Sequence, residues 1–226
     1  MDGGSADGSL NVLQHYETRL ARWVSAPDQG QADAINKGFA GTSSDIMAYL
    51  NSDDLLLPGS LAAVVEYFGA RPQVDVVYGH RILIDENDAE IGRWVLPRHD
   101  SGVLRWVDWV PQETLFWRRR AWESVGGTID VSFKFAIDWD LLLRFQDAGM
   151  RIERIDRFLG AFRVHAQQKT LANMADQGLV EMRRLRRRSH GRDVSEAEIR
   201  RAVSRYLIKH ILVDLKWRLG LSDLES

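Results

Sequence analysis

The feature that most constrains this chain is a short apolar segment that ends in two adjacent carboxylates. Residues 46–50 form an apolar run of strand length, and Asn51-Ser52-Asp53-Asp54 follows it directly. An uninterrupted run of this kind is typical of a strand that is buried on both faces of a sheet. Because ligands of open α/β sheets bind beyond the carboxyl ends of such strands, Asp53 and Asp54 are expected at a binding site.

The two neighbouring carboxylates repel each other unless a cation or hydrogen-bond donors hold them. A hard divalent ion that prefers oxygen ligands, Mg²⁺ or Mn²⁺, would do so. The alternative is an ordinary loop whose aspartates cap the helix that begins near Pro58. Both interpretations are open on this segment alone.

Strands and helices alternate along the rest of the chain, which indicates a parallel α/β sheet. Helix 58–69 is expected to face inward through Leu61, Val64, Val65 and Phe68. Further helices are predicted at residues 10–20, 31–40, 101–107, 119–125 and 139–147, and strands at 22–25, 74–79 and 152–164, with a hairpin of 81–85 and 90–96.

The composition allows one domain with an appendage, since the chain has 226 residues of which 45% are hydrophobic. There is no cysteine, no signal-peptide pattern and no apolar run near the ~20 residues that span a membrane. We therefore expect a cytoplasmic location, either free or peripheral at the inner face of the membrane. Catalytic residues are expected in 1–170, and 171–226 is expected to be a helical extension.

The extension is predicted to form two helices, residues 171–190 and 195–219. The second opens with a capping box from Ser195 to Glu198. The extension has a charge balance of +4, which leaves −6 on residues 1–170. The arginines between Arg183 and Arg188 either contact anionic lipid or a lipid-diphosphate acceptor, or form a solvated helix face.

Six segments, taken in order, resemble family 2 glycosyltransferases of the GT-A fold. They are residues 2–8, residues 28–38, Leu50-Asn51-Ser52-Asp53-Asp54, residues 111–116, residues 138–144 and Phe162-Arg163-Val164-His165. The resemblance implies a GT-A-like, Rossmann-related, mostly parallel sheet flanked by helices. It also implies a nucleotide-sugar donor, a saccharide or lipid-linked acceptor, and a role in cell-surface polysaccharide or glycolipid synthesis.

The resemblance further implies the roles of four aspartates. The aspartate of the first segment, here Asp2, helps to hold the nucleotide base, and Asp28 lies in the loop that borders the nucleotide. The family's acidic pair maps onto Asp53 and Asp54. Asp53 would face the ribose or the metal, and Asp54 would be the direct ligand of the metal that bridges the diphosphate.

Two later residues complete the implied site. The carboxylate that opens the second acidic helix is the family's usual catalytic base, which here is Asp138. The family often has another acid just before it, where this chain has Ile137, so the motif is shortened. His165 matches a late histidine that can reach the metal or the diphosphate.

The chemistry is consistent with these assignments. A nucleoside diphosphate leaves with developing charge that a metal can neutralise. The acceptor hydroxyl must lose a proton on the opposite face of the sugar, which requires one positioned carboxylate. An inverting reaction needs no covalent nucleophile.

Each assignment also has a structural alternative. Asp138 could act as a helix N-cap, Asp140 could support the helix dipole, and His165 could be a hydrogen-bonding group. Three tryptophans could stack on a sugar but are more often core residues: Trp106, Trp109 and Trp139.

Two rival functions follow from the same residues. The chain could be a non-catalytic nucleotide or carbohydrate binding module derived from such an enzyme. A nucleic-acid binder is disfavoured by the acidic body and by the absence of aromatics around the arginine run.

The N-terminus gives one more expectation. Family members begin with a strand and a helix before the aspartate-glycine loop, whereas here that loop starts at Met1. The resemblance thus predicts an incomplete catalytic domain with weak donor affinity. Its open edge would be covered by the C-terminal helices or by a second copy of the chain.

Overall fold

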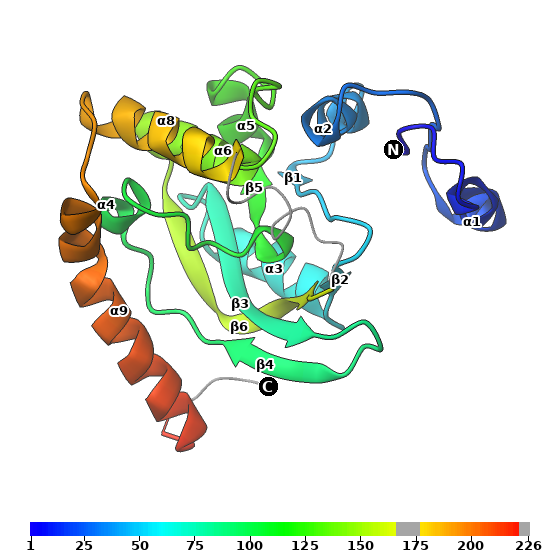
Figure 1. The fold of residues 1–226 in the computed structure, drawn as a ribbon. Coiled ribbons are helices and arrows are strands. Elements are labelled where there is room, and N and C mark those ends of the chain that lie inside the picture. Colours follow the sequence, from blue (N-terminus) through cyan, green and yellow to red (C-terminus); the bar gives the residue numbers. More distant parts are fainter. Residues whose placement is uncertain (166–176, 222–226) are drawn as a thin grey trace.

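The computed structural model describes residues 1–165 and 177–221 and is built around one six-stranded sheet (Figure 1). The strands follow the order β1-β5-β3-β6-β2, and β4 pairs with the other part of β3. The strands are β1 (Ile46–Met47), β2 (Leu55–Leu56), β3 (Val76–Ile84), β4 (Glu90–Trp94), β5 (Phe116–Arg118) and β6 (Ile152–Arg163).

The sheet is mixed, which corrects the expectation of a mostly parallel sheet. Strands β1, β3 and β6 run in one direction, but only the β3–β6 pair consists of parallel neighbours. The other pairs are antiparallel because β2, β4 and β5 enter the sheet in the reverse direction. Hairpin pairing to β3 and short returning strands therefore replace some of the expected parallel crossovers.

Helices cover both faces of the sheet (Figure 1). On one face, α3 (Ser60–Ala70) buries Val64 and Phe68 against a small cluster from β3, β5 and β6. The expected inward positions Leu61 and Val65 are 59% and 58% exposed, so α3 buries a narrower stripe than predicted. On the other face lies the larger core, which includes α5 (Arg119–Ser124) and α6 (Ile137–Asp147).

The strand predicted over 152–164 is confirmed as β6, but other predicted strands have different lengths in the structure. Of the apolar run at residues 46–50 only β1 is a strand, since the last three residues leave the sheet and lead into the Asp53 loop. The strand expected over 74–79 and the first arm of the hairpin form one continuous strand, β3. Residues 22–25 contribute a single parallel bridge between Asp2 and Ser25.

The remaining short elements connect this frame. They are α1 (Ser9–His15), η1 (Glu17–Arg19), α2 (Gln31–Phe39), α4 (Ser101–Leu104) and η2 (Gln112–Thr114). No residue of α1 is buried, and Figure 1 shows α1 at the periphery beyond α2.

Two C-terminal helices pack on the body. They are α8 (Leu179–His190) and α9 (Glu196–Arg218), and the predicted capping box at Ser195 is confirmed. Leu185, Val203 and Tyr206 join the larger core. The predicted domain boundary near residue 170, and the first residues of the helix predicted from 171, lie outside the described residues. Within the described ranges, no helix is both long and apolar enough to cross a bilayer.

Candidate active site

Asp2 and Asp28 line the same pocket, as expected of two residues that border one ligand. The pocket has a volume of about 160 Å³, and Val24 and Lys37 also line it. The Asp2 carboxylate accepts hydrogen bonds from the Ser25 hydroxyl and from Ser5, and these bonds lower the pKa of Asp2 to about 2. Asp2 is therefore ionised and fixed in orientation at neutral pH.

A glycine allows the two walls of this pocket to meet. A Cβ atom on Gly3 would lie 2.9 Å from a carboxylate oxygen of Asp28. The other carboxylate oxygen of Asp28 accepts a hydrogen bond from the Gly30 backbone at 2.8 Å. Gly3 is thus needed for the close approach of the two walls, because any side chain there would meet Asp28.

Asp53 and His165 are brought together across 112 residues of sequence. The Asp53 carboxylate lies 3.1 Å from Nε2 of His165, and their side chains are 42% and 22% exposed. The backbone carbonyl of Asp53 accepts a hydrogen bond from Arg163 at 3.0 Å. This pair is accessible and consists of one carboxylate and one imidazole.

Asp54 lies in a different environment from its neighbour. It is 5% exposed, and its carboxylate accepts hydrogen bonds from the Arg163 backbone at 3.1 Å and the Asn51 amide at 3.3 Å. Burial, followed by repulsion from Glu113 and Asp53, raises the pKa of Asp54 to about 6. A buried carboxyl with internal donors fits a supporting role for the loop.

Asp138 occupies the second position of α6 and does not cap that helix. The N-cap residue is Ala136, without a side-chain hydrogen bond. The Asp138 carboxylate is half-buried and accepts one hydrogen bond, at 3.0 Å, from the backbone of Trp139. Burial raises the pKa of Asp138 to about 6. Backbone hydrogen bonds and the positive charge of Arg81 lower this pKa, but their effect is smaller than that of burial.

Two other groups share the surroundings of Asp138. The hydroxyl of Tyr49 has a raised pKa because it is buried and because Asp138 and Asp108 carry negative charge nearby. Desolvation of the carboxyl and then repulsion from Asp138 raise the pKa of Asp108, although that residue as a whole is exposed. The two carboxyls are therefore coupled and do not ionise independently.

A buried ion pair that the sequence analysis did not single out connects the two acidic regions. Glu113 is 2% exposed and accepts two hydrogen bonds from the Arg81 guanidinium, one of them at 2.8 Å. Its negative charge contributes to the raised pKa of both Asp54 and Asp138. The signal in the sequence was a charged residue in the middle of residues 109–117, a segment that is apolar at both ends.

The loop before α6 is held from three sides. Asn36 of α2 exchanges two hydrogen bonds with the Ile129 backbone, and Lys134 donates to the carbonyl of Gln29 in the nucleotide-side loop. Glu181 of α8 accepts hydrogen bonds from the backbone N–H groups of residues 134, 135 and 136. The position of Asp138 therefore depends on α2, on the Asp28 loop and on α8.

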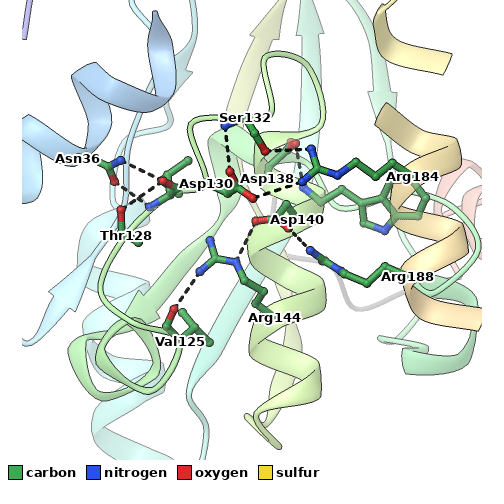
Figure 2. Close-up of polar contacts among 12 residues, drawn as sticks. Asn36, Val125, Thr128, Asp130, Ser132, Asp138, Asp140, Arg144, Arg184 and Arg188 are labelled. Atoms are coloured by element: carbon green, nitrogen blue, oxygen red, sulfur yellow. Dashed lines mark hydrogen bonds and ion pairs between the residues drawn. The ribbon is translucent and has the colours of Figure 1, made fainter. Parts of the chain in front are cut away.

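Figure 2 draws the polar contacts that Asp140 and two arginines of α8 make near the start of α6. Asp140 is 1% exposed and pairs with Arg144 at 2.8 Å and with Arg188 at 2.5 Å. Arg184 reaches Ser132 at 2.9 Å, and Arg186 donates to the Trp106 carbonyl at 2.7 Å. Part of the arginine run thus makes polar contacts with the body, although Arg184 and Arg188 also remain exposed.

Two of the three tryptophans considered for sugar stacking are core residues. Trp139 is fully buried and donates to the Leu104 carbonyl at 2.7 Å, and Trp109 is 5% exposed. Trp106 is partly buried, and its ring centroid lies 3.9 Å from that of His190.

The donor set is compatible with Mg²⁺ or Mn²⁺. Among residues 1–165 and 177–221, no group of three or more His, Asp or Glu side chains forms a closed metal cage. Mg²⁺ commonly takes only one or two protein carboxylates, with the remaining positions filled by water and substrate phosphates. Asp53 and His165 offer such an open, two-residue site.

Curated relatives of the chain are glycosyltransferases. An uncharacterised glycosyltransferase of Mycobacterium tuberculosis is 30% identical over 149 residues, which are 64% of this chain and 55% of that protein. The O-antigen biosynthesis protein RfbC of Myxococcus xanthus is 29% identical over 164 residues, 73% of this chain and 12% of that protein. The chain thus spans about half the length of the first relative and a small part of the second.

Solved structures show the same fold class. Staphylococcus aureus TarS, residues 1–349 with UDP-GlcNAc, matches with a TM-score of 0.63 at 14% identity, covering 93% of this chain and 62% of that one. The mannosyltransferase PcManGT of Pyrobaculum calidifontis, with GDP-Man and Mn²⁺, matches with a TM-score of 0.54 at 14% identity, covering 98% and 70%. The mixed sheet flanked by helices is therefore a GT-A-type fold, which confirms the expected class.

The family follows from the sequence match. The model of glycosyl transferase family 2 matches residues 1–127, more than half of the chain. The protein belongs to this family, as the ordered segments predicted.

Proposed function

We propose that the chain transfers a sugar from a nucleotide-sugar donor to an acceptor hydroxyl with inversion at the anomeric carbon. The observation that carries this proposal is the Asp138 carboxyl. This carboxyl is half-buried, and its pKa is raised to about 6. The Glu113 carboxylate, which pairs with Arg81, acts electrostatically both on Asp138 and on Asp54 of the acidic loop. A base and a diphosphate site joined in this way suit a single displacement.

The residues divide the reaction as follows. Asp2 and Asp28 hold the nucleotide base in the pocket lined by Val24 and Lys37. Asp138 accepts the proton of the acceptor hydroxyl while the new C–O bond forms. The bond from the anomeric carbon to the diphosphate oxygen breaks on the opposite side, and its electron pair leaves with the nucleoside diphosphate.

Asp53 and His165 would hold the divalent ion, Mn²⁺ or Mg²⁺. When bound, such an ion supplies positive charge where the leaving diphosphate becomes more negative. The sequence-based expectation gave direct ligation to Asp54. The burial of Asp54 and its internal donors lead us to propose Asp53 as the carboxylate ligand, with Asp54 holding the loop through the Arg163 backbone.

The UDP-GlcNAc of TarS and the GDP-Man and Mn²⁺ of PcManGT support, by similarity, a nucleotide-sugar donor and a divalent ion for this chain. The relative RfbC, which is named for O-antigen biosynthesis, supports a saccharide or lipid-linked acceptor in the assembly of cell-surface glycans.

The experiment combines thermal shift with transfer. Nucleoside diphosphates are tested with and without Mn²⁺ on the full chain and on two variants, Asp53→Asn and Asp54→Asn. Saturating ligand at a hundred times its Kd stabilises a protein by about 2.7 kcal/mol. We expect Asp53→Asn to lose the metal-dependent part of that shift, and Asp54→Asn to keep it on a less stable fold.

Release of nucleoside diphosphate from a panel of nucleotide-sugars then measures turnover with candidate acceptors. If the chain binds a donor but releases no nucleoside diphosphate with any acceptor tested, the result supports the rival function, a non-catalytic binding module. A metal-dependent shift lost only in Asp54→Asn would restore Asp54 as the ligand.

A further inference from the structure

A second hollow lies on the side of the molecule away from the nucleotide pocket. It has a volume of about 400 Å³ and lies between the loop of residues 97–100 and α9. Figure 1 shows α9 along one edge of the molecule, with its C-terminal half extending past β4. No residue of the proposed reaction lines this hollow.

The lining is basic and contains an unsatisfied buried donor. Arg98, Lys209 and Lys216 line it together with one carboxylate, Asp100, which already caps α4 through two backbone N–H groups. None of these three cations makes an ion pair with another described residue. Tyr206 also lines the hollow, is 4% exposed, and its hydroxyl has no hydrogen-bond partner among the described residues.

These features fit an anionic oxygen ligand. A buried hydroxyl without a partner is costly and usually indicates a missing acceptor. Three unpaired cations that line the same hollow as Tyr206 favour a compact group with several negative oxygens, such as a phosphate.

The outer face of α9 continues the hollow with an apolar stripe. Six residues at helical spacing are between 49% and 66% exposed: Leu207, Ile208, Ile211, Leu212, Leu215 and Leu219. The opposite face of the helix packs on the body, where Tyr206 contacts Trp109 and Trp217 contacts Phe158. Leu212 belongs to the stripe and also lines the hollow.

We propose that α9 rests on a membrane surface and that the hollow binds the phosphate headgroup of an anionic phospholipid. The apolar stripe enters the acyl boundary while Arg98, Lys209 and Lys216 hold the phosphate and the Tyr206 hydroxyl donates to it. This inference does not depend on the donor or on the metal.

The charge of α9 distinguishes a lipid surface from other occupants. Residues 196–218 contain six Lys or Arg and three Asp or Glu, and all but one of the acids lie in the first turn. Two such faces brought together in a dimer would repel. A nucleic acid would need stacking aromatics on the outer face, whereas that face carries leucine and isoleucine.

Vesicle sedimentation of the full chain tests the proposal. Vesicles of phosphatidylcholine are compared with vesicles in which part of it is replaced by phosphatidylglycerol, at increasing salt. We expect binding only to the anionic vesicles, weakening as salt rises. Lys209→Gln with Lys216→Gln should weaken it about 30-fold, since each cation near the surface contributes about 1 kcal/mol.

Matched controls separate the site from general charge and general hydrophobicity. Arg71→Gln with Arg151→Gln removes the same charge from exposed positions elsewhere and should leave binding within about twofold. Ile211→Ser with Leu215→Ser should weaken binding about tenfold, whereas Leu61→Ser with Val65→Ser, on the exposed side of α3, should not.

Tyr206→Phe distinguishes a role of the hydroxyl in lipid binding from a purely structural role. Removing an unpartnered hydroxyl should leave the free energy of unfolding equal or higher, while binding to anionic vesicles falls. Equal binding to neutral vesicles, no vesicle binding, or a dimer that Ile211→Ser with Leu215→Ser dissociates would each overturn the proposal. A thermal shift by inorganic phosphate without vesicle binding would overturn it too, in favour of a soluble phosphate.

Discussion

Replacing Glu181 by glutamine tests how α8 holds the loop that leads into α6 and Asp138. The Glu181 carboxylate accepts hydrogen bonds from the backbone N–H groups of Lys134, Phe135 and Ala136 at 2.8–2.9 Å, and the residue is 5% exposed. Two of these donors share one carboxylate oxygen, and the third uses the other. A glutamine has the same shape but only one oxygen, so it leaves at least one N–H group facing an amide.

The magnitude follows from these contacts. A buried donor left without a partner costs about 1–3 kcal/mol, and loss of the charge weakens the bonds that remain. We expect Glu181→Gln to lower the free energy of unfolding by about 2–4 kcal/mol. For a chain of this size, that lowers Tm by about 5–15 °C.

Urea unfolding and calorimetry measure the effect. The control is Glu66→Gln, an exposed glutamate of α3, which should change stability by less than about 0.5 kcal/mol. Turnover should also fall in Glu181→Gln because the loop it holds leads directly into Asp138. Equal unfolding free energies for the two variants would refute the reasoning.

Two further predictions concern Asp138 and the glycines. Asp138→Asn should lower turnover by about 10²–10⁴ with donor binding retained, and wild-type turnover should fall as the pH drops through about 6, because protonated Asp138 cannot accept a proton. A pH profile measured on both proteins checks this, and unchanged transfer in the variant would contradict it. Gly79→Ala should cost about 1–3 kcal/mol because its Cβ would lie 2.5 Å from Leu159, whereas Gly69→Ala, with open space around it, should be neutral or stabilising in urea unfolding.

The local part of this fold could be predicted from the sequence. The capping box at Ser195 and the acidic loop after β1 depend on residues a few positions apart. The length of β3 could not, because β3 runs without a break where it pairs with β6. Tertiary pairing decided these boundaries rather than local propensity.

The candidate site was likewise predictable only in part from the sequence. The sequence predicted that Asp53 and Asp54 lie at a binding edge, but it could not distinguish their environments. That difference comes from Arg163, whose backbone N–H binds Asp54 from 109 residues away. Glu113 escaped notice for a similar reason, since its partner Arg81 lies on β3, 32 residues earlier in the chain. Burial of one carboxyl and exposure of its neighbour is a property of the assembled sheet.

The arginine run of α8 can be explained by the acid that it covers. Asp140 is 1% exposed, so its charge requires guanidinium partners, and the neighbouring turn of α6 supplies only Arg144. Arg188 supplies the second partner, and Glu181, two turns earlier in α8, holds the loop that enters α6. A buried charge that loses one partner is strongly destabilising. The position of Asp138, between these two attachments, is therefore set by a helix that the sequence placed outside the catalytic domain.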